Sequence, residues 1–172
     1  GSYTDLSGNA GSGHAITLNS APIAGADAIS TDQNSGISGS VLSNDSDLDS
    51  DALVVSAVSG LAPGTEIEGT GKGLFTINAD GSYSFNPNGQ FDYLAAGESA
   101  TSTIEYTISD GKGGASTASI TVTIDGVNDA PTAEGTLVDQ FSVDALAGVS
   151  IATSAAFADA DSSNTLIYSA SS

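Results

Sequence analysis

Short runs of β-branched and aromatic residues, often alternating with polar ones, restrict the fold of this chain more than any other feature. The clearest runs are residues 53–58, 74–77, 83–85, 103–108 and 120–124. Runs of this length and pattern are typical of β-strands that bury one face. No segment combines a sustained helical period with helix caps, and residues 90–98 could form at most a single turn.

Turn sequences separate the predicted strands. Asp80-Gly81 predicts a tight hairpin, and the glycine-rich residues 110–114 predict a longer loop between two long strands. Several short strands at this spacing indicate an all-β fold, a β-sandwich of antiparallel strands. We expect the core to combine the alternate Ile and Val of the long strands with six aromatic residues, Phe75, Tyr83, Phe85, Phe91, Tyr93 and Tyr106.

Charge excludes whole classes of partner. The chain has 172 residues, with 21 acidic against 2 basic residues and a net charge of −19. Nucleic acid is therefore excluded as a partner, and an anionic membrane surface is disfavoured, because both attract basic residues. No run approaches the 18 or more apolar residues of a membrane span, so we expect no direct membrane insertion. No signal peptide is recognised either.

Catalytic groups are scarce. Cysteine is absent, which excludes disulfides and thiolate metal sites. His14 is the single imidazole of the chain, and we interpret it as an exposed bystander in a Gly/Ser-rich stretch. Counting acidic residues does not exclude a glycosidase-type pair of carboxylates, yet nothing else in the sequence supports one. We therefore predict that the chain is not an enzyme.

Carboxylates gather at three places along the chain. Residues 44–51 carry four of them on alternate positions, and similar chemistry returns at residues 125–131 and 159–161. Two unit charges about 4 Å apart repel by roughly 4 kcal/mol at an effective dielectric of 20. A bound Ca²⁺, which takes six to eight oxygen ligands, would neutralise them. The alternatives are solvated turns whose side chains bond their own backbone, and a surface that is merely soluble or salt-adapted.

An internal repeat sets the expected organisation. Ala21-Pro22 recurs as Ala130-Pro131 about 109 positions later, a period of one domain. We expect residues 1–20 to be the tail of a preceding repeat, with Gly1-Ser2 as a tag scar. Residues 21–129 are expected to form one complete sandwich, and residues 130–172 the start of a following domain in a tandem array.

Four segments carry a family resemblance. LFTINADGSY at 74–83, LAAGE at 94–98, YTISDG at 106–111 and VNDAP at 127–131 resemble the VCBS and bacterial cadherin-like repeats of giant RTX adhesins. The resemblance covers about residues 21–131, and the last forty residues resemble the start of a dystroglycan-type cadherin-like domain. It implies an immunoglobulin-like or cadherin-like sandwich from a secreted bacterial surface protein.

The resemblance also implies a function. The chain would be a non-catalytic extender repeat, exported by type I secretion, that serves cell adhesion or biofilm formation. Ca²⁺ between neighbouring repeats of the same polypeptide would stiffen the rod. The alternative is an adhesive module that binds a glycan, or a like repeat on another cell, through the sandwich surface.

The resemblance assigns candidate calcium ligands to two junctions. Those of the second junction, between residues 21–129 and 130–172, are Asp32, Asp110, Asp125, Asn128, Asp129, Asp159 and Asp161. Those of the first junction, between residues 1–20 and 21–129, are Asp5, Asn19, Asp47 and Asp49, with Asp45 and Asp51 as alternates. Ser20 replaces a linker Asp at the first junction, so we expect the stronger site at the second.

Overall fold

The computed structural model describes residues 18–133 and 157–161, and these residues form ten strands and no helix. The strands are β1 (Asp27–Asp32), β2 (Ile37–Ser40), β3 (Val54–Val58), β4 (Glu66–Glu68), β5 (Leu74–Ile77), β6 (Ser82–Asn86), β7 (Ser99–Ser109), β8 (Ala115–Asp125), β9 (Thr132–Ala133) and β10 (Phe157–Ala158). The predicted all-β fold is confirmed. Within the described residues, no helix is available that could cross a membrane.

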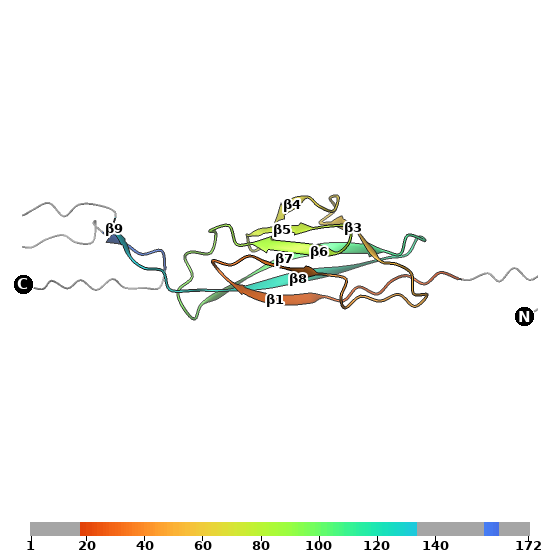
Figure 1. Ribbon diagram of the computed structural model, residues 1–172, viewed down its shortest axis with the longest axis horizontal. Helices are drawn as coiled ribbons and strands as arrows, with labels where there is room; N and C mark the ends of the chain where they lie inside the picture. Colours follow the sequence, from red (N-terminus) through yellow and green to blue (C-terminus); the bar gives the residue numbers. More distant parts are fainter. Residues whose placement is uncertain (1–17, 134–156, 162–172) are drawn as a thin grey trace, which may run out of the picture.

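Two four-stranded sheets make the sandwich (Figure 1). One has the order β1-β8-β7-β3 and the other the order β2-β6-β5-β4, while β9 and β10 form a separate two-stranded ladder. The ladders are antiparallel, as predicted, except that β1 pairs with β8 in parallel. The first and last strands of the sandwich therefore run in the same direction, side by side.

The core lies between the two sheets because side chains alternate along each strand. In β7, Ile104, Tyr106 and Ile108 are buried while the intervening residues are partly or fully exposed. Phe75 of β5 pairs with Phe85 of β6, and their ring centroids lie 4.7 Å apart. Strands of both sheets thus contribute one face to the same apolar interior.

Five of the six predicted aromatic core residues are buried, and the prediction for Tyr93 is wrong. The Tyr93 side chain is 47% exposed, whereas Phe91, two positions earlier, is fully buried. Tyr93 lies in a turn between β6 and β7 instead of on a strand. Strand alternation, which would have placed both rings on one face, does not apply there.

The β7–β8 hairpin separates the two ends of the domain. Its eleven residue pairs run from Ser109 opposite Ala115 to Ser99 opposite Asp125. At about 3.3 Å per residue, this hairpin is roughly 35 Å long. Its turn lies beside residue 19, where the described chain enters the sandwich, and its open end continues into the segment after Asp125. We call these the N-terminal and C-terminal ends of the sandwich.

Candidate metal centre

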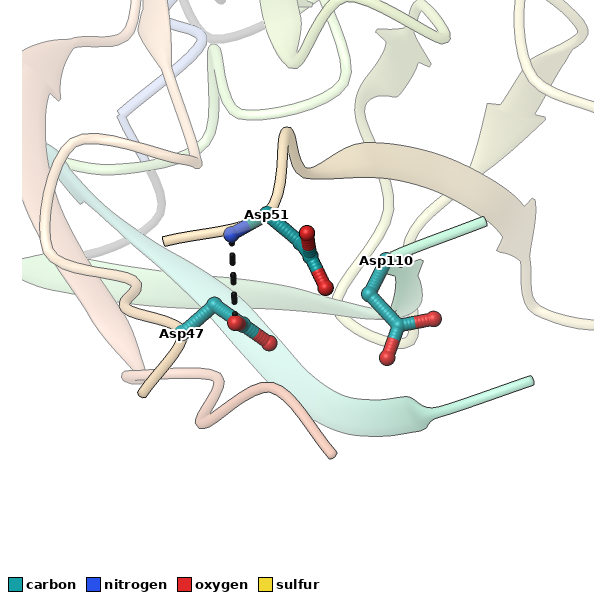
Figure 2. Close-up of side chains that lie close together, drawn as sticks. All are labelled: Asp47, Asp51 and Asp110. Carbon is teal, nitrogen blue, oxygen red and sulfur yellow. Dashed lines mark hydrogen bonds between the residues drawn. The ribbon is translucent and has the colours of Figure 1, made fainter. Parts of the chain in front are cut away.

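Three carboxylates meet at the N-terminal end of the sandwich. Asp47 and Asp51 belong to the acidic loop, residues 43–53 between β2 and β3, and Asp110 begins the hairpin turn, residues 110–114 between β7 and β8. One oxygen from each lies within 4.8 Å of the others (Figure 2). We call Asp47, Asp51 and Asp110 the carboxylate triad. The triad therefore needs two loops that are far apart in the sequence.

Asp110 is held by its own turn. Its Oδ1 accepts hydrogen bonds from the backbone amides of Lys112 (2.7 Å) and Gly114 (2.9 Å), and its Oδ2 accepts one from Asn19 Nδ2 (2.7 Å). The Asn19 bond, followed by these amide bonds, lowers the pKa of Asp110, so the carboxylate is ionised. A Cβ at Gly114 would lie 2.1 Å from Asp110 Oδ2, so the turn requires glycine there.

Asp47 and Asp51 present oxygens that lack partners. Asp47 Oδ1 accepts the backbone amides of Asp49 (2.8 Å) and Asp51 (3.2 Å), the second of which is drawn in Figure 2. The Oδ2 atoms of Asp47 and Asp51 are buried, and within the described part of the chain they have no hydrogen-bond partner. A buried anionic oxygen without a partner is costly. The three carboxylates lie close enough to one another that they could hold a metal ion.

One positive side chain reaches the triad. Lys112 Nζ lies 2.5 Å from Asp51 Oδ1, and this bond, with the charge of Asp51, raises the pKa of the lysine. The Lys112 side chain is 60% exposed and that of Asp51 is 11% exposed. Leu18, Asn19 and Asp49 join these two residues in lining an open cavity of about 250 Å³.

The other two members of the acidic run bind the segment that enters the sandwich. Asp49 Oδ2 accepts the backbone amide of Ser20 (2.6 Å), and Asp45 Oδ1 accepts that of Gly25 (2.7 Å). Burial raises the pKa of Asp45 and, nearby, that of Asp27. Tyr106 is fully buried, and its hydroxyl lies 2.8 Å from Asp27 Oδ2 as hydrogen-bond donor. Asp45 and Asp49 therefore hold the chain against the domain and lie outside the triad.

The predicted pairing within the acidic run is corrected by this geometry. The sequence pairs Asp47 with Asp49 and keeps Asp51 as an alternate, but the structure brings Asp47 together with Asp51. Residues 43–53 form short turns and one isolated bridge at Ser46 in place of a strand, so alternate residues do not face one way. Asp47 Oδ1 accepts the Asp49 backbone amide, the kind of local bond expected of a solvated turn. Asp5 lies outside the described residues.

The resemblance places Asp110 at the second junction, but the structure places it at the opposite end of the sandwich. It sits in the hairpin turn, while Asp125 is the last residue of β8 and belongs to the eleventh residue pair from that turn. Asp32 is register partner of Asp125, and its carboxylate accepts the Asn34 amide (2.9 Å) and the Ser35 hydroxyl (3.0 Å) of the following turn. Asp125 and Asn128 are exposed.

The remaining second-junction residues are linked through backbone amides. The Asp129 amide donates to Asp161 Oδ2 (3.1 Å), and the Asp161 amide donates to Asp159 Oδ1 (3.0 Å). Asp161 is 3% exposed. Three of the predicted residues thus come together, although within residues 18–133 and 157–161 the triad is the single group of three carboxylates close enough to share an ion.

Gln33 is a residue of this end that sequence reasoning missed. It is 1% exposed, and its Nε2 donates to Asp129 Oδ2 (3.0 Å) and to the Val127 carbonyl (3.1 Å). Its Oε1 accepts the Val127 amide (3.2 Å). Gln33 therefore fastens the segment after β8 to the turn after β1. A buried Gln is rarely left without partners, but nothing in the sequence marks this one as buried.

The fold and its acidic end define a β-sandwich module with a polar site built from loops at one end. A family model for the bacterial cadherin-like domain matches residues 19–126, and the chain belongs to this family. Domains of this family are typically extracellular, adhesion-type repeats and are generally non-catalytic. A comparison with curated proteins gives no match.

Among solved structures, the chain is similar to a nucleoside hydrolase-related hypothetical protein from Saccharophagus degradans that is associated with carbohydrate metabolism. The two are 20% identical, with a TM-score of 0.38 over 63% of this chain. The chain spans about a quarter (26%) of that structure. A likeness this limited carries no inference about activity.

Proposed function

We propose that the chain is a calcium-binding extender repeat of a secreted bacterial surface adhesin. The observation that carries this proposal is the meeting of Asp110 with Asp47 and Asp51. Each of the last two has a buried Oδ2 atom without a hydrogen-bond partner among the described residues. Asp47, Asp51 and Asp110 would hold the ion, and its charge would offset their mutual repulsion.

The donor set fits calcium. The triad offers carboxylate oxygens from loops, and Ca²⁺ accepts oxygen ligands in irregular geometry, whereas Mg²⁺ demands near-octahedral geometry. Thiolates, which would favour softer metals, are absent from the chain. Asn19 bonds Asp110 from the segment that precedes the sandwich. An ion at the triad would therefore stiffen the connection to a preceding repeat.

The proposal also includes the second junction, between residues 21–129 and 130–172. Asp129 and Asp161 are joined by a hydrogen bond of 3.1 Å, and β9, which follows Asp129, pairs with β10, which precedes Asp161. This arrangement supports an interdomain contact between residues 21–129 and 130–172, with a weaker calcium site than the triad. The parent protein would be an RTX-type adhesin exported by type I secretion, active in cell adhesion or biofilm formation.

The exposed aromatic residues support the extender function over an adhesive one. A face that binds a glycan commonly offers several flat rings, because each ring buries a large apolar area. In residues 18–133 and 157–161, Tyr93 is the single aromatic side chain that is largely exposed. One ring gives no such face, so binding of a glycan or of a like repeat remains the second candidate.

Calorimetric titration with calcium tests the proposal. The wild-type chain should bind with a dissociation constant of about 10⁻⁴ to 10⁻³ M, as extracellular modules do. The double variant Asp47→Asn/Asp51→Asn should bind fewer ions, because the triad keeps a single carboxylate. The matched control Glu66→Gln/Glu105→Gln removes two exposed charges from the strands and should bind as the wild type does.

Thermal melting gives a second measurement. Calcium at 100 times its dissociation constant adds about 2.7 kcal/mol per site, which is about 10 °C for a domain of this size. A chelator should lower the midpoint of the wild type and of the control by this amount, and that of Asp47→Asn/Asp51→Asn by less. An unchanged number of bound ions in that variant, or a wild-type midpoint that ignores the chelator, would contradict the proposal.

A further inference from the structure

The two basic residues of the chain are placed very differently. Lys112 Nζ lies 2.5 Å from Asp51 Oδ1, at the carboxylate triad. Lys72 lies in the loop between β4 and β5, where its backbone carbonyl accepts a hydrogen bond from the Ser102 hydroxyl, and its side chain is exposed. In a chain with 21 acidic residues, the triad thus holds one of only two available cationic side chains.

The hairpin turn fixes Lys112 in this place. Its backbone amide donates to Asp110 Oδ1 (2.7 Å), while its side chain reaches Asp51 in the other loop. Gly111 and Gly113, on either side, have positive φ angles of 70° and 105°, which L residues rarely adopt. The backbone of Lys112 is therefore tied to one triad carboxylate and its ammonium to another.

We infer that Lys112 is a tethered competitor of the calcium ion and sets the affinity of the triad. This inference rests on the proposed function. The ammonium engages Asp51 Oδ1 and leaves the Oδ2 atoms of Asp47 and Asp51 to a cation. Asp51 can offer both oxygens to an ion only after Lys112 has moved away. Whether or not Lys112 moves away, its positive charge beside the site weakens the binding of a calcium ion.

The same ion pair has a role when no ion is bound. Three carboxylates within 4.8 Å repel one another, and Lys112 offsets part of this repulsion. The lysine therefore narrows the difference in stability between the calcium-free and calcium-bound chain. A repeat built in this way keeps its loops together at low calcium, and it binds the ion in the range of extracellular concentrations.

The test compares Lys112→Gln with Lys72→Gln in the full 172-residue chain. Both variants remove one positive charge and leave a polar side chain of similar length, but only the first removes the charge at the triad. Calcium binding is followed at fixed ionic strength by the amide NMR signals of residues 47, 51 and 110. Lys112→Gln should tighten binding roughly two- to fivefold, the range for an exposed ion pair, and Lys72→Gln should leave it unchanged.

Two further measurements do not depend on affinity. In the wild type, calcium should shift the signals of the Lys112 side chain and leave those of Lys72 in place. In a chelator, Lys112→Gln should melt below Lys72→Gln, because its triad has lost the counter-ion.

The possible failures are distinguishable. If the wild type binds calcium and the two variants bind alike, or Lys112→Gln binds more weakly, the inference is wrong and the proposed function stands. If none of the three proteins binds calcium at the triad, both are overturned.

Discussion

Replacing Tyr106 by Phe tests whether a buried hydroxyl holds the acidic end of the sandwich together. The Tyr106 hydroxyl donates to Asp27 Oδ2 at 2.8 Å, and the carbonyl oxygens of Gly25 (2.9 Å) and Val41 (3.3 Å) also lie within reach. Phe keeps the ring and its packing, so the substitution removes the hydroxyl alone. A hydrogen bond to a charged partner contributes about 1.5–3 kcal/mol. We expect a loss of about 2 kcal/mol at neutral pH, or about 8 °C in the melting midpoint.

The loss should depend on pH in a predictable direction. Burial raises the pKa of Asp27, and the Tyr106 hydroxyl opposes this rise. Without the hydroxyl the folded-state pKa of Asp27 rises further above its unfolded value. The folded state then disfavours the ionised carboxylate, so stability is lost as the pH rises through the folded pKa. The deficit of Tyr106→Phe should therefore be largest at neutral pH and shrink towards about pH 4, near the ordinary pKa of Asp.

Urea unfolding of Tyr106→Phe at both pH values, with Tyr93→Phe as the control, measures this effect. The Tyr93 ring is 47% exposed, so loss of its hydroxyl should change the free energy of unfolding by less than about 0.5 kcal/mol. An equal deficit for Tyr106→Phe at acid and neutral pH would show that the carboxylate bond is not the source of the stability. No deficit at either pH would refute the reasoning altogether.

Two other substitutions test the two ends of the sandwich. Gln33→Ala removes both hydrogen bonds to Val127. Hydrogen exchange at the Val127 amide should therefore accelerate at least tenfold, while exchange at the core amides is unchanged. Equal exchange in the variant and the wild type would mean that Gln33 is not needed to hold this segment. Gly114→Ala places a Cβ 2.1 Å from Asp110 Oδ2 and should weaken calcium binding at the triad. Gly111→Ala is the control, because a Cβ there would meet nothing within 4 Å. It should cost about 1 kcal/mol in stability through backbone strain and leave the calcium affinity unchanged. Equal calcium affinities in the two variants would contradict this role for Gly114.

Much of the fold could be predicted because its signals are local. Alternation along residues 103–108 and 120–124 identifies β7 and β8, and Asp80-Gly81 identifies the turn before β6, where Gly81 has a φ of 83°. The ring of Tyr93 could not be placed by alternation, because the residue lies in a turn. The parallel pairing of β1 with β8 joins residues that are more than ninety positions apart, and no local pattern encodes such a contact.

The candidate site was harder to predict, although one error was avoidable. A turn between two long antiparallel strands must lie at the opposite end from the residues that follow the second strand, so Asp110 could not join Asp125 at one junction. The pairing of Asp47 with Asp51 was not accessible in this way. It depends on successive turns whose side chains bond their own backbone, and such turns have no fixed period.

The parallel pairing of β1 and β8 has a mechanical consequence. Six register pairs, from Asp27 with Ile120 to Asp32 with Asp125, join the first and last strands of the sandwich. A force that pulls the two ends of the domain apart draws β1 and β8 along their common axis in opposite directions. The pairs are then loaded together in shear and do not open one after another from one end. Under tension, the domain therefore yields only when this whole ladder slides, whatever ions its ends hold.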